Sequence, residues 1–406
     1  MADPSYPTRI GLEQALQIVA ARAAQHRLPV ETVRLADAQG RVLAEDIRAP
    51  HPLPPFANSA MDGFALRAAD LPAQGERSFG VIGDVFAGAV AAPEVGEGQC
   101  VRITTGAPIP PGADTVVIKE NVVVEGELVV VKAGEKPGAN VRAAGEDYAE
   151  GELAFASGTP LGVAQRAVLA ALGVDNVFTR RCPRIAVIAT GNELVPAGQP
   201  LGFGQIHESN ALMIAAFAGE SGARVVVQRC VRDDPEALRV ALLDAAADAD
   251  VIITSGGVSA GEADHLPGVL RGIGEIHFHK VRLKPGMPTL FGELGACLYF
   301  GLPGNPVAAA VTYRVFIAFA LRAMSGVTSV PKPARARLDA PLHKHHARAE
   351  FARCLLHVDD EGVQWASVHA KQGSGMLRGL AETDALALLP EDAREFAKGD
   401  IVLLWP

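Results

Sequence analysis

The sequence contains few cysteines, and its net charge is not positive. Five cysteines occur in 406 residues, and no two of them form a CxxC pair. Because they are odd in number and far apart, we expect reduced, buried thiols in a cytosolic protein. The formal net charge of -9 at pH 7 argues against nucleic acid as a partner, since that surface needs a basic stripe to neutralise phosphates.

The sequence also lacks a long uninterrupted apolar run. The longest apolar stretch, Val307–Leu321, is interrupted by Thr312, Tyr313 and Arg314, and is too short and too polar to span a bilayer. The first residues, MADPSYPTRIG, contain no basic stretch followed by an apolar core, so no signal peptide is visible. These absences predict a cytoplasmic protein with no membrane partner.

The pattern along the chain predicts a multidomain protein of α/β and β type. Four prolines in APHPLPPF, from Ala49, mark a boundary that no helix can cross. Residues 51–142 contain short β-like runs between Gly and Pro turns, and we expect them to form an inserted β-domain. Residues 1–50 and 143–180 then form a discontinuous N-terminal, linking domain.

The second half of the chain has a different pattern. From residue 181 to 327, apolar strands alternate with helices, which is typical of a doubly wound parallel sheet. Residues 328–406 contain about five short strand-like runs, and we expect a C-terminal β-barrel-like domain.

Two glycine loops at predicted strand ends carry carboxylates. They are TGNE at 190–193 and SGGVSAGEAD at 255–264. Ligands of doubly wound sheets lie beyond the carboxyl ends of the strands. The glycine N–H groups can hold an oxyanion and the carboxylates can hold Mg²⁺. The alternative is two ordinary strand-to-helix turns with Asp264 as an N-cap.

A helix start and a basic segment are the next candidates. In LPGNP, Asn305 suits an N-cap and Pro306 the first helical turn, so this end either binds an anion or begins a core helix. In HFHKVRLKPGMP, Lys280, Arg282 and Lys284 alternate, which predicts one face of a strand that meets either water or an anion. The HKHH run at 343–346 lies in a charged stretch and is a weak metal candidate.

Seven motifs together resemble one family, the bacterial MoeA-type molybdopterin molybdenumtransferases, which are related to the gephyrin E domain. The motifs are NSAMDG at 58, RITTGAPIPPGAD at 102, ATGNEL at 189, TSGGVSAGEAD at 254, LKPGMP at 283, GLPGNP at 301 and QGSGML at 372. Each motif alone is weak, but seven in this order are highly specific and cover nearly the whole chain. The resemblance implies an elongated four-domain homodimer whose active site lies between the α/β domain of one subunit and the inserted β-domain of the other.

The resemblance also implies a late step of molybdenum cofactor synthesis. Adenylylated molybdopterin and molybdate enter, AMP leaves, and the dithiolene sulfurs bind molybdenum with the help of Mg²⁺. Contact with the molybdopterin adenylyltransferase that supplies the pterin is a further implied partnership. The sequence does not distinguish molybdate from tungstate.

The family's functional positions can be placed residue by residue. Glu193 and Asp264 would hold the metal and the nucleotide, and Asp233 is preferred to Asp234 as the next acidic position. The implied catalytic set is Asp62, Thr105, Glu193, Asp233, Asp264, Lys280 and Lys284. The implied molybdate and pterin set is Lys284, Pro285, Pro303, Pro306, Arg353 and Ser374.

Two of these residues would act across the dimer. Asp62 and Thr105 belong to the inserted β-domain and would reach the partner's site. Asp147 is a weaker candidate, and Glu262 is interpreted as a helix-start residue.

Three departures from the family pattern stand near the implied site. Ala308 replaces a common Ser, Met287 replaces a frequent Lys, and His207-Glu208 replaces a more usual Tyr-Asp. Met287 removes one positive charge from the anion site. Two rival functions remain open, a dimeric scaffold that uses the same fold and a molybdopterin adenylyltransferase.

Overall fold

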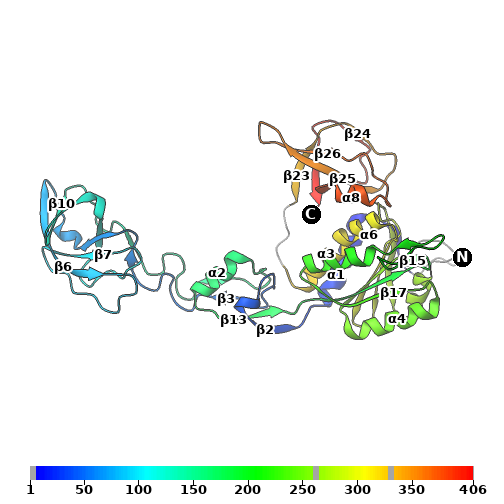
Figure 1. Ribbon diagram of the computed structural model, residues 1–406, viewed down its shortest axis with the longest axis horizontal. Helices are drawn as coiled ribbons and strands as arrows, with labels where there is room; N and C mark the ends of the chain where they lie inside the picture. The colour runs from blue at the N-terminus through cyan, green and yellow to red at the C-terminus, as the bar shows by residue number, and fades with distance from the viewer. Residues whose placement is uncertain (1–5, 259–264, 328–332, 406) are drawn as a thin grey trace.

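The computed structural model describes residues 6–258, 265–327 and 333–405. The chain is elongated and has four parts (Figure 1). The inserted β-domain lies at one end, the α/β and C-terminal domains lie side by side at the other, and a small linking domain lies between them. The predicted four-domain layout is confirmed.

A seven-stranded sheet forms the α/β domain, in the order β1-β19-β21-β22-β18-β14-β17. Neighbouring strands are parallel except at β21, which is antiparallel to both β19 and β22. Residues 295–296 join β21 to β22 in a two-residue hairpin, in which Gly295 has a φ of +60°. The strands are β1 (Thr8–Ile10), β14 (Arg184–Thr190), β17 (Arg224–Val231), β18 (Val251–Ser255), β19 (Glu275–Val281), β21 (Leu290–Leu294) and β22 (Cys297–Leu302).

Helices cover both faces of this sheet. Alternate residues of β14 pack into two different clusters, which is why its sequence is a continuous apolar run. One face packs against α1, α3, α6 and α7, and the other against α4 and α5. The helices are α1 (Leu12–Gln25), α3 (Asn210–Glu220), α4 (Pro235–Asp248), α5 (Leu266–Ile273), α6 (Pro306–Thr312) and α7 (Ala318–Met324).

The N-terminus differs from the predicted division into domains. Residues 1–50 were expected to form part of the linking domain, but β1 pairs with β19 and α1 packs on the sheet. The buried stripe Ala15, Val19 and Ala23 explains the difference, because it completes the core of the α/β domain.

The expectation that the stretch around Val307–Leu321 is too short and too polar to span a bilayer is wrong by length and composition alone, because the helical run extends over Pro306–Met324 and passes both tests. A π-helical segment, Tyr313–Ile317, links α6 to α7 within it. However, 72% of its most apolar window is buried inside the structure. This burial is typical of a core helix.

Paired strands connect the inserted β-domain to the rest. β2 (Val30–Arg34) pairs with β13 (Asn176–Arg180), and β3 (Ile47–Arg48) with β12 (Leu153–Phe155), so the chain leaves and returns side by side. The linking domain also contains α2 (Val163–Ala171), and β4 (Asn58–Ser59) pairs with β11 (Val141–Arg142).

The inserted sheet has the order β8-β5-β7-β6-β10-β9. Its strands are β5 (Gly63–Leu66), β6 (Glu76–Val85), β7 (Gln99–Ile103), β8 (Thr115–Ile118), β9 (Val122–Glu125) and β10 (Leu128–Lys132).

A closed sheet forms the C-terminal domain, as predicted. The order β25-β26-β23-β29-β27 returns to β25 through the additional β25–β27 pairing. Closure leaves no free edge within this ring. The elements are β20 (Leu283–Lys284), β23 (Ala334–Leu338), β24 (Leu342–His343), β25 (Ala349–Val358), β26 (Gln364–Val368), α8 (Leu377–Ala381), β27 (Ala385–Leu389), β28 (Glu395–Phe396) and β29 (Ile401–Trp405).

The burial of Phe316 predicts its contribution to stability. Phe316 is fully buried and its ring lies 6.1 Å from that of Phe278. We expect Phe316→Ala to lower the free energy of unfolding by about 3–5 kcal/mol, because it removes a core ring and leaves a cavity. Leu212→Ala on α3 is the control, since that side chain is 71% exposed. Urea denaturation followed by circular dichroism measures both, and equal effects would contradict the core assignment.

Candidate active site

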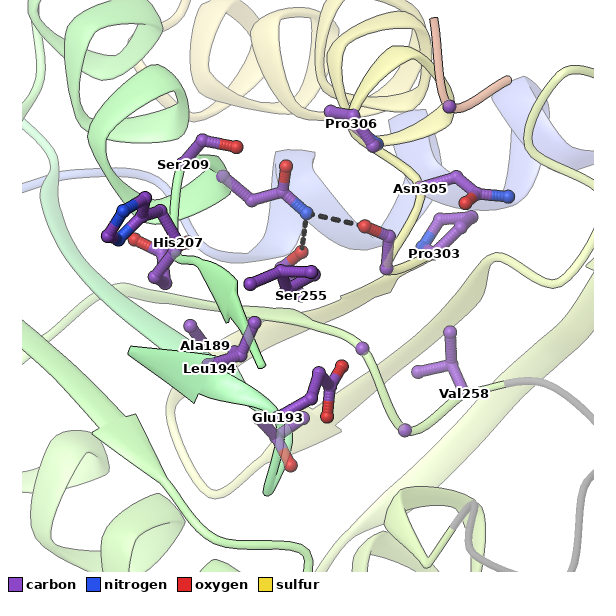
Figure 2. Close-up of a pocket in the computed structure, with 18 of the residues that line it drawn as sticks. Ala189, Glu193, Leu194, His207, Ser209, Ser255, Val258, Pro303, Asn305 and Pro306 are labelled. Atoms are coloured by element: carbon purple, nitrogen blue, oxygen red, sulfur yellow. Dashed lines mark hydrogen bonds between the residues drawn. The ribbon is translucent and has the colours of Figure 1, made fainter. Parts of the chain in front are cut away.

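A cavity of about 690 Å³ lies at the carboxyl ends of three sheet strands (Figure 2). Thr190 ends β14, Ser255 ends β18, and Pro303 follows β22. The parallel register places Ala189 opposite Ser255 and Ser255 opposite Leu302. The loops that follow these three neighbouring strands therefore begin at the same edge of the sheet. This is the edge at which the sequence predicted a ligand.

Gly256 shapes the cavity wall. Its φ is +99°, and a Cβ at this position would lie 2.4 Å from the carbonyl oxygen of Thr190. Any other residue would therefore push the two strand ends apart. From the sequence we expected this glycine to allow a ligand to approach the backbone closely. In the structure, the group that it allows to approach is the Thr190 carbonyl at the end of the adjacent strand.

Three carboxylates line this cavity, and its described lining contains no Lys or Arg. Glu208 accepts a hydrogen bond of 2.7 Å from the backbone N–H of Ala211 at the start of α3. Asp233 accepts a hydrogen bond from the Thr190 hydroxyl. The Glu193 backbone carbonyl accepts a hydrogen bond of 2.9 Å from the Ile206 N–H, but its carboxylate has no hydrogen bond or ion pair within the described part of the chain and is open to a ligand.

The carboxylates of the cavity lie close enough to Cys230 to affect its thiol. Burial, followed by the charges of Glu208, Glu193 and Asp233, raises the pKa of this thiol. Cys230 is nevertheless an exposed residue, as it lies on the edge strand β17. The cysteines are free, as expected, but the expectation that all of them are buried is wrong at two positions, since Cys182 is only partly buried and Cys230 is exposed.

The geometry separates the two neighbouring aspartates. Asp234 caps α4, accepting a hydrogen bond of 2.8 Å from the backbone N–H of Ala237. Asp233 lines the cavity instead. The preference for Asp233 therefore has a structural reason, because Asp234 is occupied by its helix.

Asn210 ties the loops together and was not identified from the sequence. Its side-chain amide donates to the Ser255 hydroxyl at 2.8 Å and to the Gly304 carbonyl at 2.7 Å, as Figure 2 shows by dashed lines. The only sequence signal was a polar residue at the start of the predicted helix.

A second cavity, of about 340 Å³, adjoins the first. The two share Pro288, Pro303 and Asn305. The second is lined by Lys284, Pro285 and Ser374 from the predicted oxyanion set, with the departures Met287 and Ala308. Its described lining contains Lys and Arg but no Asp or Glu, so the two cavities have opposite charge.

Asn305 and Pro306 begin α6, as predicted, with Pro306 in the first turn. The Asn305 side chain does not cap the helix. Its amide donates instead to the Ser374 hydroxyl at 2.9 Å, while the Val307 N–H donates to the Ser374 carbonyl at 3.0 Å. The QGSGML loop is thereby held against the helix start.

The predicted basic strand face is wrong. Lys280 has a φ of +68°, β19 ends at Val281, and Lys284 belongs to β20 in the next domain's sheet. Arg282 pairs with Glu391, and Lys284 with Glu350 at 2.9 Å. Only Lys284 of these residues lines a described cavity.

Arg353 holds a loop and does not line the second cavity. It is 1% exposed and donates to the carbonyls of Lys371, Gly373 and Met376 at 2.6, 3.1 and 3.3 Å. Burial lowers the pKa of its guanidinium. Arg353 therefore positions the loop that carries Ser374.

Arg348 lines the second cavity and was missed from the sequence. Its guanidinium nitrogen lies 4.0 Å from the Met287 sulfur. It forms no ion pair with a carboxylate in the described parts of the chain. Arg348 belongs to none of the seven motifs. It could have been found only by asking which residue supplies the positive charge that the family resemblance led us to expect at position 287.

Asp62 and Thr105 meet each other but not these cavities. Asp62 accepts two hydrogen bonds of 2.9 Å from Thr105, one from the backbone N–H and one from the hydroxyl, and its other oxygen lies 3.5 Å from the Lys119 ammonium. They belong to the inserted β-domain at the far end of the molecule (Figure 1). Asp147 lies in the linking segment, where its N–H donates to the Leu53 carbonyl. Glu262 and Asp264 lie outside the described residues.

Known proteins match this chain along nearly its whole length. Residues 10–173 match the MoeA N-terminal region (domain I and II), residues 186–323 a probable molybdopterin binding domain, and residues 335–406 the MoeA C-terminal region (domain IV). The chain belongs to the MoeA family. A molybdopterin molybdenumtransferase of Haemophilus influenzae is 33% identical over 93% of each chain.

Further members agree with this assignment. Molybdopterin molybdenumtransferase 2 of Mycobacterium tuberculosis is 37% identical over 92% of this chain and 94% of its own. The crystal structure of a molybdopterin biosynthesis MoeA protein from Pyrococcus horikoshii is 30% identical, with a TM-score of 0.83 over 98% of this chain and 99% of that one. The family resemblance and the fold class that it implied are confirmed.

The Thr105 contacts predict the titration of Asp62 in this MoeA chain. The two Thr105 hydrogen bonds and the Lys119 charge lower the pKa of Asp62. Because the pKa of Asp62 is lowered, its hydrogen bonds and ion pair stabilise the folded state at neutral pH. This stabilisation is lost as the pH falls through the pKa that Asp62 has in the folded state. We expect Thr105→Val to raise the pKa of Asp62, measured by carboxyl-carbon NMR titration.

Thr104→Val is the matched control for this titration. The Thr104 hydroxyl accepts a hydrogen bond from the Ala87 N–H, so it serves a neighbouring loop. An identical Asp62 pKa in Thr105→Val and wild type would show that the hydroxyl contributes nothing.

Proposed function

We propose that the chain inserts molybdenum from molybdate into adenylylated molybdopterin and releases AMP, as a cytoplasmic homodimer. The observation that carries the proposal is the pair of adjoining cavities of opposite charge. The names of the similar proteins support the same reaction class. Contact with a molybdopterin adenylyltransferase that delivers the substrate is part of the proposal.

The larger cavity suits the nucleotide end of the substrate together with Mg²⁺. Glu193 and Asp233 offer oxygen ligands from two different strand ends, and the Glu193 carboxylate has no described partner. Oxygen ligands and bridging phosphates are what Mg²⁺ prefers. When bound, the ion would neutralise charge on the phosphate-linked oxygens. Asp264, which the family resemblance pairs with Glu193 as a metal ligand, lies outside the described residues.

The smaller cavity suits molybdate. Lys284 and Arg348 supply positive charge, and the Ser374 hydroxyl lines the same space. Asn305 orients that hydroxyl through its 2.9 Å hydrogen bond. Because Pro288, Pro303 and Asn305 line both cavities, an oxyanion in one lies next to a substrate in the other.

The dimer completes the site in this proposal. The inserted β-domain, which carries Asp62, lies at the end of the molecule opposite the α/β domain (Figure 1), and a carboxylate held by two hydrogen bonds is well placed to contact a substrate bound to a second subunit. The inserted β-domain would otherwise have no role in the reaction.

The first test measures AMP release from adenylylated molybdopterin with Mg²⁺ and molybdate, together with pterin-bound molybdenum. Glu193→Gln and Asp62→Asn should each lower the rate about 100-fold or more, since each removes a charge from the site. Co-expression with two affinity tags then yields a heterodimer of these two inactive chains. One of its two sites is intact, so half of the wild-type activity should return.

Each outcome has a clear meaning. An inactive heterodimer would contradict a site shared between subunits. A well-folded dimer that releases no AMP would contradict the transferase and favour a scaffold.

Arg348 should replace the charge lost at Met287. A hydrogen bond to a charged group contributes about 1.5–3 kcal/mol. We therefore expect Arg348→Ala to raise the half-saturating molybdate concentration at least about ten-fold, with little change in AMP release at saturating molybdate. Molybdate titration of molybdenum insertion measures both quantities.

A second substitution tests whether position or charge matters. Met287→Lys in the Arg348→Ala background should restore molybdate affinity, because Met287 lines the same cavity and lies 4.0 Å from the Arg348 nitrogen. Arg335→Ala is the control, since Arg335 lies on β23 and lines neither cavity. A molybdate response unchanged by Arg348→Ala would remove Arg348 from the site.

A further inference from the structure

The carboxylate that pairs with Lys284 at the second cavity also contacts a histidine. Lys284 and Glu350 are direct partners across the parallel β20–β25 pair, and Glu350 Oε1 lies 2.9 Å from the Lys284 ammonium. The other oxygen, Oε2, lies 3.1 Å from His346 Nε2. Glu350 is 7% exposed and does not belong to the described lining of the cavity, so it acts on the cavity through Lys284.

The His346 ring lacks hydrogen bonds although its nitrogens are buried. Neither Nδ1 nor Nε2 has a hydrogen-bond partner in the described chain. Buried polar atoms of this kind are uncommon and unfavourable. A proton on the imidazole would convert the 3.1 Å contact with Glu350 into a charge-assisted hydrogen bond. His346 can therefore exist in two states, one neutral and one bonded to Glu350.

The surrounding charges determine which state is populated. The groups that act on His346 are Glu350 on β25, Lys284 on β20, and Arg348 and Lys344 in the segment between β24 and β25. Burial lowers the pKa of His346, the three cations lower this pKa further, and Glu350 alone opposes them. The ring is therefore neutral at neutral pH. A further negative charge nearby would favour its protonation.

Lys344 is a fixed cation in this group. Its side chain is buried, and its ammonium donates hydrogen bonds to the carbonyls of Arg348 at 2.9 Å and Glu391 at 3.3 Å. The charges of Glu391, Asp392 and Arg394 act on Lys344 from the segment after β27. Lys344 thus holds the loop in place, and its charge does not move toward the cavity.

We propose that Glu350 and His346 are positioning residues that couple oxyanion binding in the second cavity to uptake of one proton. An oxyanion attracts the Lys284 ammonium away from Glu350, and the carboxylate then bonds to protonated His346. Because coupling is reciprocal, a proton on His346 tightens oxyanion binding in turn. Affinity therefore rises as the pH falls through the range in which His346 takes up its proton. The inference rests on the proposed function for the identity of the oxyanion, molybdate.

The test measures equilibrium binding of molybdate to the full-length chain without pterin. We expect the dissociation constant to fall at least about five-fold between about pH 8 and pH 5.5, a range that spans the ordinary histidine pKa. Isothermal titration in buffers of different ionisation enthalpy should show proton uptake on binding. His346→Gln should keep the wild-type affinity at the alkaline end and lose both the pH response and the proton uptake.

Glu350→Gln tests the carboxylate between the two groups. It should tighten molybdate binding at the alkaline end, because Lys284 is then no longer compensated. It should also remove the pH response, since His346 then faces three cations and no carboxylate. In turnover, the half-saturating molybdate concentration should fall, with little change in AMP release at saturating molybdate. A merely structural role would not separate these quantities.

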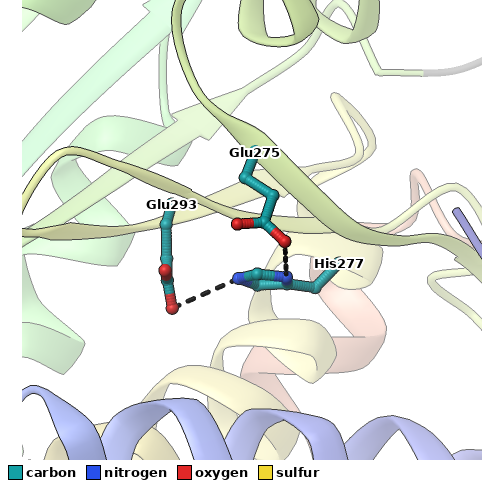
Figure 3. Close-up of side chains that lie close together, drawn as sticks. All are labelled: Glu275, His277 and Glu293. Atoms are coloured by element: carbon teal, nitrogen blue, oxygen red, sulfur yellow. Dashed lines mark ion pairs between the residues drawn. The ribbon is translucent and has the colours of Figure 1, made fainter. Parts of the chain in front are cut away.

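Two other histidines that contact carboxylates serve as controls. His343, in the same HKHH run, pairs with Glu395. His277 on β19 lies between Glu275 and Glu293 (Figure 3), with ring nitrogens 3.4 and 3.2 Å from their oxygens. Neither histidine belongs to the described lining of the second cavity. His343→Gln and His277→Gln should keep the pH response, and circular dichroism verifies that each variant is folded.

Each result decides one point. A pH response that persists in His346→Gln, or that is lost in a folded control variant, would overturn the assignment to His346. Wild-type binding that does not depend on pH, or an absence of molybdate binding, would overturn the coupling itself. Failure of AMP release with pH-dependent molybdate binding intact would contradict the transferase and support the coupling.

Discussion

The parallel hydrogen-bond ladder from β14 through β18 to β22 is the constraint on which the candidate active site depends. It brings three loops that are distant in sequence to one edge of a sheet. Gly256 allows the closest of these approaches, because a side chain there would collide with the Thr190 carbonyl. Asn210 then links two of the loops by hydrogen bonds. The carboxylates are therefore positioned by backbone pairing more than by contacts with one another.

The same sheet explains why the cavities differ in charge. The larger cavity lies over the strand ends and collects the carboxylates of loops that follow β14 and β17. The smaller one lies where β20 leaves the α/β domain and joins β25, so its cations come from the C-terminal domain boundary. Two short strand pairs carry the inserted β-domain away from both. In one chain, the residues of the proposed site are therefore divided between the inserted β-domain and the α/β domain. A dimer can bring the inserted β-domain of one subunit to the cavities of the other.

Periodicity and motif order predicted most of the fold and part of the site. Continuous apolar runs such as Arg184–Thr190 indicated buried parallel strands, since both faces of that sheet are covered. The placement of α1 could not be predicted, because its apolar stripe fits any core and only the sheet shows which one it completes. Lys280, Arg282 and Lys284 were misplaced for a similar reason. Alternation implies one face only while the strand continues, and here β19 ends at Val281.

Arg348 shows why a motif alone is an incomplete description of a binding site. The family resemblance led us to expect a lysine at position 287, and the methionine found there carries no charge to attract an anion. The chain instead offers a guanidinium 4.0 Å from that methionine sulfur, from a segment 61 residues later. Electrostatic attraction depends on where charge lies in space and not on its place in the sequence. Lys284 is paired with Glu350, so the Arg348 charge is the less compensated of the two. The cavity can therefore keep its positive potential without a lysine at position 287, because Arg348 places a charge in the same space.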